Sequence, residues 1–189
     1  MPFEFHAHQD VPDVIVIRPR VFADERGWFQ ETFKRGDFER LGIQGDFRQD
    51  NHSRSTVRGA IRGLHYQLHP QAQGKLVRCT VGAIFDVAVD IRRGSPTFGK
   101  WAGADLSADN HDILWVPEGF AHAYCTLTDQ AEVLYKSTAE YSPGHERSIR
   151  WDDSDLNIRW PVSTPALSPK DAAAPRFKDA ENNFTWSAS

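Results

Sequence analysis

The sequence predicts an all-β sandwich or barrel formed by one compact domain that spans residues 1–189. Short apolar runs dominate the chain, they recur roughly every ten residues, and Gly, Pro, Asn and Asp separate them. A chain of 189 residues can bury roughly 70% of its unfolded surface, and 40% hydrophobic and 12% aromatic content indicates a packed core. No long helix is needed to explain the pattern.

The expected strands are apolar segments rich in Val, Ile, Phe and Tyr, which are favoured on a pleated surface. The first two precede a more polar stretch, and the remaining ones follow one another closely to the end of the patterned region. They cover residues 14–19, 27–33, 60–67, 75–82, 83–92, 112–117, 122–127 and 131–141. If the last of these is one continuous strand, Tyr135 and Tyr141 share a face, because they are six residues apart.

A short helix is expected at RGDFERLGI, between the second and third strands. Asp37 can cap its start and Gly42 can end it, because Asp accepts hydrogen bonds from free amides and Gly adopts the left-handed conformation. A second short helix is expected at SPKDAAAP. Ser168 is a plausible cap there, Pro169 occupies the favoured first position, and Asp171 completes a capping pattern.

The charge and cysteine content exclude several classes of protein. The formal net charge is -4, so no overall positive field attracts nucleic acid or an anionic membrane. The first residues do not resemble a signal peptide, and no window approaches the ~20 apolar residues of a membrane span. Cys79 and Cys125 lie in apolar segments, which favours two free buried thiols and a cytoplasmic protein, although a disulfide stays open.

His65 lies within the strand-like segment RGLHYQ, where His65 and Gln67 share a face. The stretch HYQLHPQAQGKLVRCTVG resembles the first metal-binding motif of cupin barrels, with its ligands changed. Gln67 replaces the second histidine, and Lys75 stands where a glutamate ligand is expected. An ammonium group cannot ligate a divalent cation.

The segment PEGFAH, at residues 117–122, resembles the second cupin motif. Only His65 and His122 then occupy metal-ligand positions, and two imidazoles beside Lys75 do not form a zinc or iron site. We therefore expect a metal-free pocket, and the resemblance to the two cupin motifs implies a cupin-type jelly-roll barrel of antiparallel sheets with a few short peripheral helices.

Six segments in register resemble the dTDP-4-dehydrorhamnose 3,5-epimerase family. They are RGLHYQ, QGKLVRCTVG, DIRRGSPTFGKW, LWVPEGFAHAY, YKSTAEYSPGHERSIRWDD and LSPKDAAAP, within a match that runs from about Val21 to Asp171. The resemblance implies a homodimer that works without a cofactor on a dTDP-4-keto-6-deoxy sugar nucleotide. Nucleic acid and membranes are not expected partners.

Inverting a carbon beside a ketone requires a base, a group that stabilises the enolate oxygen, and an acid on the opposite face. Imidazole, with a reference pKa of about 6.5, suits the first task, so His65 is the candidate base. The resemblance pairs His65 with Asp171, assigns Lys75 to the enolate oxygen and assigns Tyr135 as the acid. Helix capping is the alternative role of Asp171, and ordinary core packing is the alternative for the tyrosine.

The sequence contains no glycine-rich phosphate loop, so side chains must hold the diphosphate. Guanidinium groups make two-point contacts with phosphate. The resemblance assigns this role to Arg26 and Arg62, with Lys170 nearby, and assigns Tyr141 to stacking on the thymine ring. The other substrate contacts that it implies are Glu31, Gln49, Asn51, His122 and Glu146.

Several alternatives stay open at this stage. A single-centre epimerase of an antibiotic-sugar pathway would share the fold and the His/Asp pair. A metal-dependent cupin oxygenase or isomerase and a non-catalytic sugar-nucleotide binder are more distant alternatives. Asp86 and Asp90 share one face of their expected strand, where they could reach the histidines of the pocket or face solvent.

Overall fold

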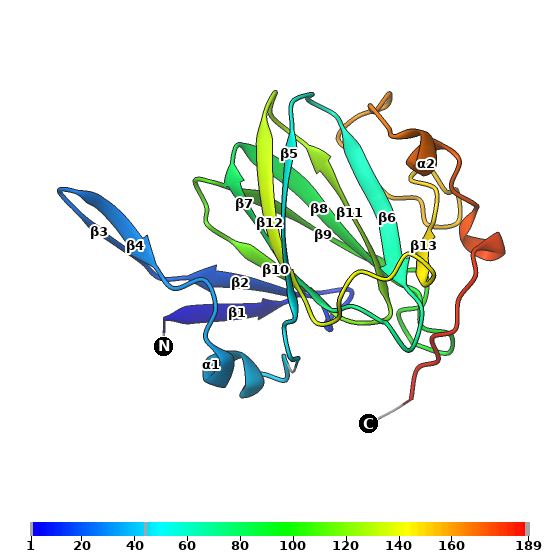
Figure 1. The fold of residues 1–189 in the computed structure, drawn as a ribbon, viewed down its shortest axis with the longest axis horizontal. Coiled ribbons are helices and arrows are strands. Elements are labelled where there is room, and N and C mark those ends of the chain that lie inside the picture. The colour runs from blue at the N-terminus through cyan, green and yellow to red at the C-terminus, as the bar shows by residue number, and fades with distance from the viewer. Residues whose placement is uncertain (1, 44, 188–189) are drawn as a thin grey trace.

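The computed structural model describes residues 2–43 and 45–187 and consists mainly of two antiparallel sheets that face each other (Figure 1). The six-stranded sheet has the order β1 (Phe3–Ala7), β2 (Ile15–Pro19), β10 (Ile113–Val116), β7 (Lys75–Val81), β12 (Ala131–Ser137) and β5 (Gln49–Ser55). The five-stranded sheet has the order β13 (Glu146–Ser148), β6 (Ile61–Gln67), β11 (Phe120–Thr126), β8 (Ala83–Asp90) and β9 (Trp101–Ser107). This is the expected jelly-roll architecture.

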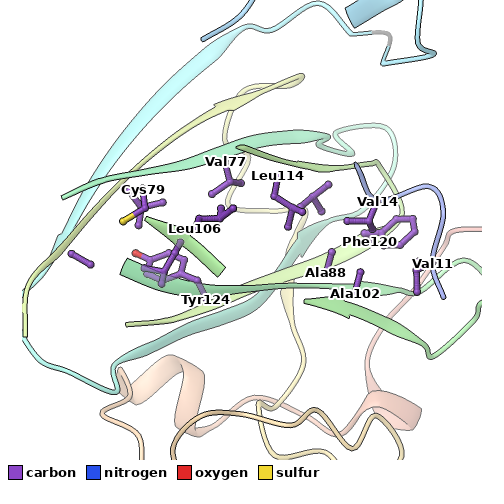
Figure 2. Close-up of a cluster of buried hydrophobic side chains, with 14 residues drawn as sticks. Val11, Val14, Val77, Cys79, Ala88, Ala102, Leu106, Leu114, Phe120 and Tyr124 are labelled. Carbon is purple, nitrogen blue, oxygen red and sulfur yellow. The ribbon is translucent and has the colours of Figure 1, made fainter. Parts of the chain in front are cut away.

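The main core lies between the two sheets, as Figure 2 shows. Val77 and Leu114 extend into it from the six-stranded sheet, and Ala88, Leu106 and Tyr124 extend into it from the five-stranded sheet. Side chains alternate across each strand, so the residues between them point outward. Part of each sheet's inner face therefore forms a packed core. On the rest of the inner face, the same alternation directs polar side chains of β6, β7, β11 and β12 into the barrel.

The outer faces of both sheets are also covered. Helix α1 (Arg35–Glu39) places Phe38 against Leu76 and Trp115 of the six-stranded sheet. On the five-stranded sheet, the C-terminal tail packs Phe184 against Ile91 and neighbouring residues. The tail includes a short 3-10 helix (Phe177–Asp179).

Every predicted strand segment contains a strand, but two of the segments extend several residues beyond the end of the observed strand. β4 (Gly27–Gln30) ends before Phe33, and β12 ends at Ser137, so Tyr135 and Tyr141 do not lie on one continuous strand. The sequence analysis missed β1, β3 (Val21–Asp24), β5, β9 and β13. β5 reads QDNHSRS and has no apolar residue, because it is an edge strand whose inner face borders a cleft.

The two helices differ in how well their caps were predicted. α1 begins at Arg35 with Lys34 at the cap position, so the prediction that Asp37 caps it is wrong; Asp37 lies in the first turn instead. Gly42 follows the helix with a φ of 79°, as expected for a terminating glycine. α2 (Pro169–Ala172) has the predicted cap, because the hydroxyl of Ser168 accepts a hydrogen bond from the amide of Asp171 at 3.1 Å.

Strands β3 and β4 form a hairpin that projects away from both sheets (Figure 1). It exposes three large aromatic side chains: Phe22 is 45% exposed, Trp28 59% and Phe29 65%. Cys79 and Cys125 are buried and unpaired, as expected. Among the described residues, no helix has the length and apolar character needed to cross a membrane.

Candidate active site

A cleft of about 520 Å³ opens between the two sheets, next to the packed core. A neighbouring hollow of about 230 Å³ continues it toward β13, since both are lined by His65, Lys75 and Tyr135. The first part brings together the predicted site residues His65, Lys75, Tyr135, Asp171, Arg62, His122 and Lys170. The second part adds Gln49, Asn51, Tyr141 and Glu146.

His65 and Asp171 form a close pair across 106 residues of sequence. Strand β6 presents the imidazole, and Nε2 lies 2.6 Å from Oδ1 of Asp171 on helix α2. The other carboxylate oxygen, Oδ2, accepts a hydrogen bond from the Ser168 hydroxyl at 2.9 Å. Asp171 therefore takes part in the helix cap and in the pair with His65 at once, so the two interpretations of this residue are compatible.

The charge of Asp171 determines which nitrogen of His65 carries the proton. Burial acts to raise the pKa of Asp171, but hydrogen bonding and charge from His65, together with Ser168, outweigh it and hold that pKa below its ordinary value. An ionised carboxylate accepts the Nε2 proton and fixes that tautomer. Nδ1 of His65 is then the unprotonated nitrogen that can accept a proton, and the side chain is 29% exposed toward the cleft.

Gly63 allows β6 to run close enough to β11 to place the two histidines side by side. His65 is the register partner of His122 in this strand pair. Gly63 has a φ of 125°, and a Cβ atom there would lie 2.4 Å from Cβ of Ala123 and 2.5 Å from the carbonyl oxygen of His122. Only glycine fits this approach without a shift of the backbone.

Lys75 is the first residue of β7 and is only 8% exposed. Burial lowers the pKa of its ammonium group to about 8, against the opposing negative charges of Asp86 and Glu146. Among the described residues, no carboxylate oxygen lies within 4.0 Å of the Lys75 ammonium group. The lysine ion pairs of the structure all involve other lysines. A buried ammonium group without a direct partner is well placed to stabilise an oxygen that becomes negative.

Tyr135 lies on β12 of the six-stranded sheet, whereas His65 lies on β6 of the five-stranded sheet. The phenol and the imidazole therefore line the same cleft from opposite walls. Burial raises the pKa of Tyr135 above its ordinary value, so the phenol keeps its proton near neutral pH. A base and an acid on opposite walls are what an inversion of configuration requires.

The mouth of the cleft carries a polar network. Lys170 lies 2.5 Å from Oε2 of Glu146, and the Tyr141 hydroxyl donates to the same carboxylate at 2.8 Å. Gln49 donates to Asn51 at 2.8 Å and accepts from the backbone amide of Tyr141 at 2.7 Å. Tyr141 itself is 54% exposed, which leaves a flat aromatic surface beside the opening.

Arg62 lies at the same opening, where Nε donates to the Ser55 hydroxyl at 3.1 Å. Its guanidinium group is thereby held against β5 with further donors left for an anion.

Arg26 and Glu31 do not line the cleft, in contrast to the other predicted site residues. Arg26 lies on the projecting hairpin, where its side chain is 85% exposed and contacts Asp24. Glu31 follows the end of β4. Within a single chain these two residues therefore lie apart from the cleft, and their contribution to a substrate site stays a prediction.

A second histidine–carboxylate pair has its histidine, His122, in the lining of the cleft and its carboxylate, Asp86, behind that lining. Nε2 of His122 is 2.6 Å from Oδ1 of Asp86, with His122 7% exposed and Asp86 fully buried. This settles the question about the two aspartates of β8. Asp86 faces the interior and reaches a pocket histidine, whereas Asp90 binds Arg92, Ser95 and Thr97 in the turn after β8.

Tyr124 also lines the cleft and was not identified from the sequence. Its hydroxyl lies 2.9 Å from that of Ser53 on β5. The signal was present, because Tyr124 is two residues after His122 on the same strand and so shares its face. In the described part of the chain, no three His, Cys, Asp or Glu side chains converge as a metal-binding group.

The jelly-roll barrel and its cleft define a cupin-type enzyme with an imidazole and a phenol on facing walls of the cleft. Residues 8–179 match the family model described as dTDP-4-dehydrorhamnose 3,5-epimerase. The chain belongs to the dTDP-4-dehydrorhamnose 3,5-epimerase family.

Individual relatives agree with this assignment. The chain is 57% identical to the dTDP-4-dehydrorhamnose 3,5-epimerase of Shigella flexneri over 173 residues, which cover 91% of this chain and 95% of that protein. The crystal structure of a 3,5-epimerase from Legionella pneumophila in complex with dTDP-4-keto-L-rhamnose is 44% identical. It superposes with a TM-score of 0.94 and covers 98% of this chain and 100% of that chain.

A 3'-monoepimerase from Streptomyces bikiniensis, solved in complex with dTDP-quinovose, is also similar, at 35% identity and a TM-score of 0.84. The match covers 92% of this chain and 88% of that chain.

Proposed function

We propose that this protein inverts C3 and C5 of dTDP-4-dehydro-6-deoxy-D-glucose to give dTDP-4-dehydro-L-rhamnose, a step of dTDP-L-rhamnose biosynthesis. The observation that carries the proposal is the cleft itself, in which the His65–Asp171 pair faces Tyr135 across the barrel and Lys75 is buried beside them. The family membership supports the same reaction.

The chemistry follows from the position of each group. Nδ1 of His65 takes the proton from the carbon beside the C4 ketone, and the C–H electron pair moves to the C4 oxygen. Asp171 stabilises the imidazolium that forms, and the Lys75 ammonium stabilises the enolate oxygen. When the enolate collapses, the Tyr135 hydroxyl donates its proton to the opposite face of the carbon. His65 then returns its extra proton to solvent and Tyr135 regains one before the next inversion.

The polar groups at the mouth of the cleft suit a nucleoside diphosphate. Arg62 and Lys170 supply positive charge there, and the exposed ring of Tyr141 offers a surface on which a thymine base can stack. Glu146, Gln49 and Asn51 fix the orientation of these groups through the hydrogen bonds described above.

We infer that the protein works as a homodimer. The projecting hairpin exposes Phe22, Trp28 and Phe29, and an aromatic surface of this kind is unfavourable in water unless a partner covers it. Burial of the hairpin against a second copy would also explain why Arg26 and Glu31 lie outside the cleft of their own chain, since they could then reach that of the partner. Sedimentation at micromolar concentration tests this. The expected location is cytoplasmic, in line with the two free thiols.

A single-centre epimerase is the second candidate, because the chain also resembles a 3'-monoepimerase. Turnover of the keto sugar nucleotide in deuterated water distinguishes the candidates. Deuterium at both C3 and C5 of the product supports the double epimerase, and deuterium at one centre supports the alternative. Deuterium at neither centre would overturn the proposal and indicate a protein that only binds the sugar nucleotide.

A further inference from the structure

Asp86 is a buried carboxylate that the reaction described above does not use. It lies on β8, between β11 and β9 of the five-stranded sheet, with Ile84 and Ala88 beside it on the inner face. The residue is completely buried, yet it does not line the cleft. A carboxylate in such a position is costly unless charged or hydrogen-bonded neighbours compensate for the lost hydration.

Only one of the two carboxylate oxygens has a direct partner. Oδ1 lies 2.6 Å from Nε2 of His122, whereas the buried Oδ2 has no hydrogen-bond partner among the residues that the structure describes. His122 therefore anchors the group from one side. The negative charge is left to act on other groups in the barrel interior.

Lys75 is the complementary case, a buried cation that makes no ion pair with any described residue. Two negative charges favour its ammonium form, and Asp86 acts more strongly than Glu146. Glu146 is already held at 2.5 Å by Lys170. Of these two carboxylates, Asp86 is thus the one that is not already paired with a lysine.

We propose that Asp86 is a positioning residue that keeps Lys75 in its ammonium form for the enolate oxygen, while His122 holds the carboxylate in place. The inference rests on the proposed epimerisation, because only a reaction with a developing oxyanion needs the cation. Asp86 acts on Lys75 through its charge and without a direct ion pair, so the ammonium group stays free to contact the substrate. A neutral Asp86 would remove the larger of the two negative charges that oppose the effect of burial on Lys75.

The test compares Asp86→Asn with Asp90→Asn. The first substitution keeps the size of the side chain and leaves a carbonyl that can accept from His122, so it removes mainly the charge. The second removes a buried carboxylate from the same strand, at a site that faces the turn and not the cleft. The titration of Lys75 is followed by NMR in protein labelled with ¹³C-lysine, with Lys75→Met used to assign the signal.

We expect Asp86→Asn to move the Lys75 midpoint, and the alkaline limb of kcat/KM, to lower pH by about one unit. Activity at pH 8 then falls roughly fivefold, and Asp90→Asn leaves the midpoint and the limb unchanged. An unchanged Lys75 midpoint in Asp86→Asn, or an equal shift in Asp90→Asn, would overturn the proposal. Other groups that face Lys75 could distort the profile, so their signals are followed too: His65, His122, Tyr124, Tyr135 and Glu146.

The NMR measurement needs no turnover, so it separates this inference from the proposed function. If the wild-type protein does not exchange or epimerise the sugar nucleotide, the proposed function fails, while the Lys75 midpoint still reports the action of Asp86. If Asp86→Asn does not fold, the ¹³Cγ signal of Asp86 is followed instead, in the wild-type protein. That signal must shift at the pH where Lys75 titrates and must lose this shift in Lys75→Met. A signal that does not respond to Lys75 would contradict the proposal.

Discussion

The barrel contains two histidine–carboxylate pairs that have the same contact distance and different surroundings. His65 and Asp171 are 2.6 Å apart, as are His122 and Asp86. The His65 side chain is 29% exposed and reaches into the cleft, whereas His122 is 8% exposed at its side chain and its carboxylate is completely buried. The distance between the two groups is therefore no guide to their roles. Access to the substrate and to solvent protons separates a base from a supporting pair.

The two carboxylates are also held differently. Asp171 lies on the four-residue helix α2, where the Ser168 hydroxyl supports it, whereas Asp86 lies on a strand with a neighbour on each side. The carboxylate of the cleft pair is thus held by a short helix, and that of the buried pair by a strand of the five-stranded sheet. Four perturbations test this comparison.

Replacing His65 by Asn should have the largest effect. A positioned base contributes ~10²- to 10⁴-fold, so kcat should fall by about 10³-fold while the melting temperature stays close to that of the wild type. Initial rates and circular dichroism measure the two quantities. Activity within a few-fold of the wild type would show that another group removes the proton.

The second prediction concerns pH. The pKa of Lys75 is lowered to about 8 by burial, and the ammonium form is the active one, so kcat/KM should fall as the pH rises through about 8. Lys75→Arg is the control, because a guanidinium group stays charged in this range, and the limb near pH 8 should disappear even if the rate is lower. Persistence of the same limb in Lys75→Arg would assign it to a different group.

Gly63→Ala tests the close approach that aligns the two histidines. The added methyl group would meet Ala123 and the backbone of His122, so unfolding should require about 1–3 kcal/mol less free energy and kcat should also decrease. Gly36→Ala in α1 is the matched control, because no atom lies within 4 Å of the new Cβ. Urea titration of both variants makes the comparison, and equal stability of the two would refute the steric argument.

Ser168→Ala should have the smallest effect. It removes the cap of α2 and the second hydrogen bond to Asp171, so stability should fall by about 1 kcal/mol and kcat by a few-fold. Ser163→Ala, in the same segment, should change neither, since that hydroxyl lies 3.5 Å from Thr164 and outside the site. A loss of stability with unchanged kcat would show that Ser168 caps the helix without supporting the base.

The sequence was informative wherever side-chain pattern and local chemistry agreed. Apolar alternation located β6, β7, β8 and β11, and the S-P-K-D pattern located α2 together with its cap. The resemblance then identified many of the residues that line the cleft, although not Tyr124. Local sequence signals were less reliable for the exact start of a helix. At α1, for example, Asp37 lies in the first turn and not at the cap position.

Three features required the structure. β5 has no hydrophobic period, because Gln49, Asn51 and Ser53 face a cleft and not a core. The orientation of Asp86 depends on which face of β8 points inward, and alternation alone gives two equivalent answers. The position of Arg26 depends on the direction in which the hairpin projects from the sheets, and alternation within the two strands does not determine that direction.

The most direct test of the account is solvent deuterium exchange into unreacted substrate by Tyr135→Phe and His65→Asn. If His65 removes the proton and Tyr135 returns one from the opposite wall, Tyr135→Phe should still exchange the C3 or C5 hydrogen with retained configuration. His65→Asn should not exchange it at all. Exchange that continues at the wild-type rate in His65→Asn would contradict the account, because the proton would then be leaving through a group other than this imidazole.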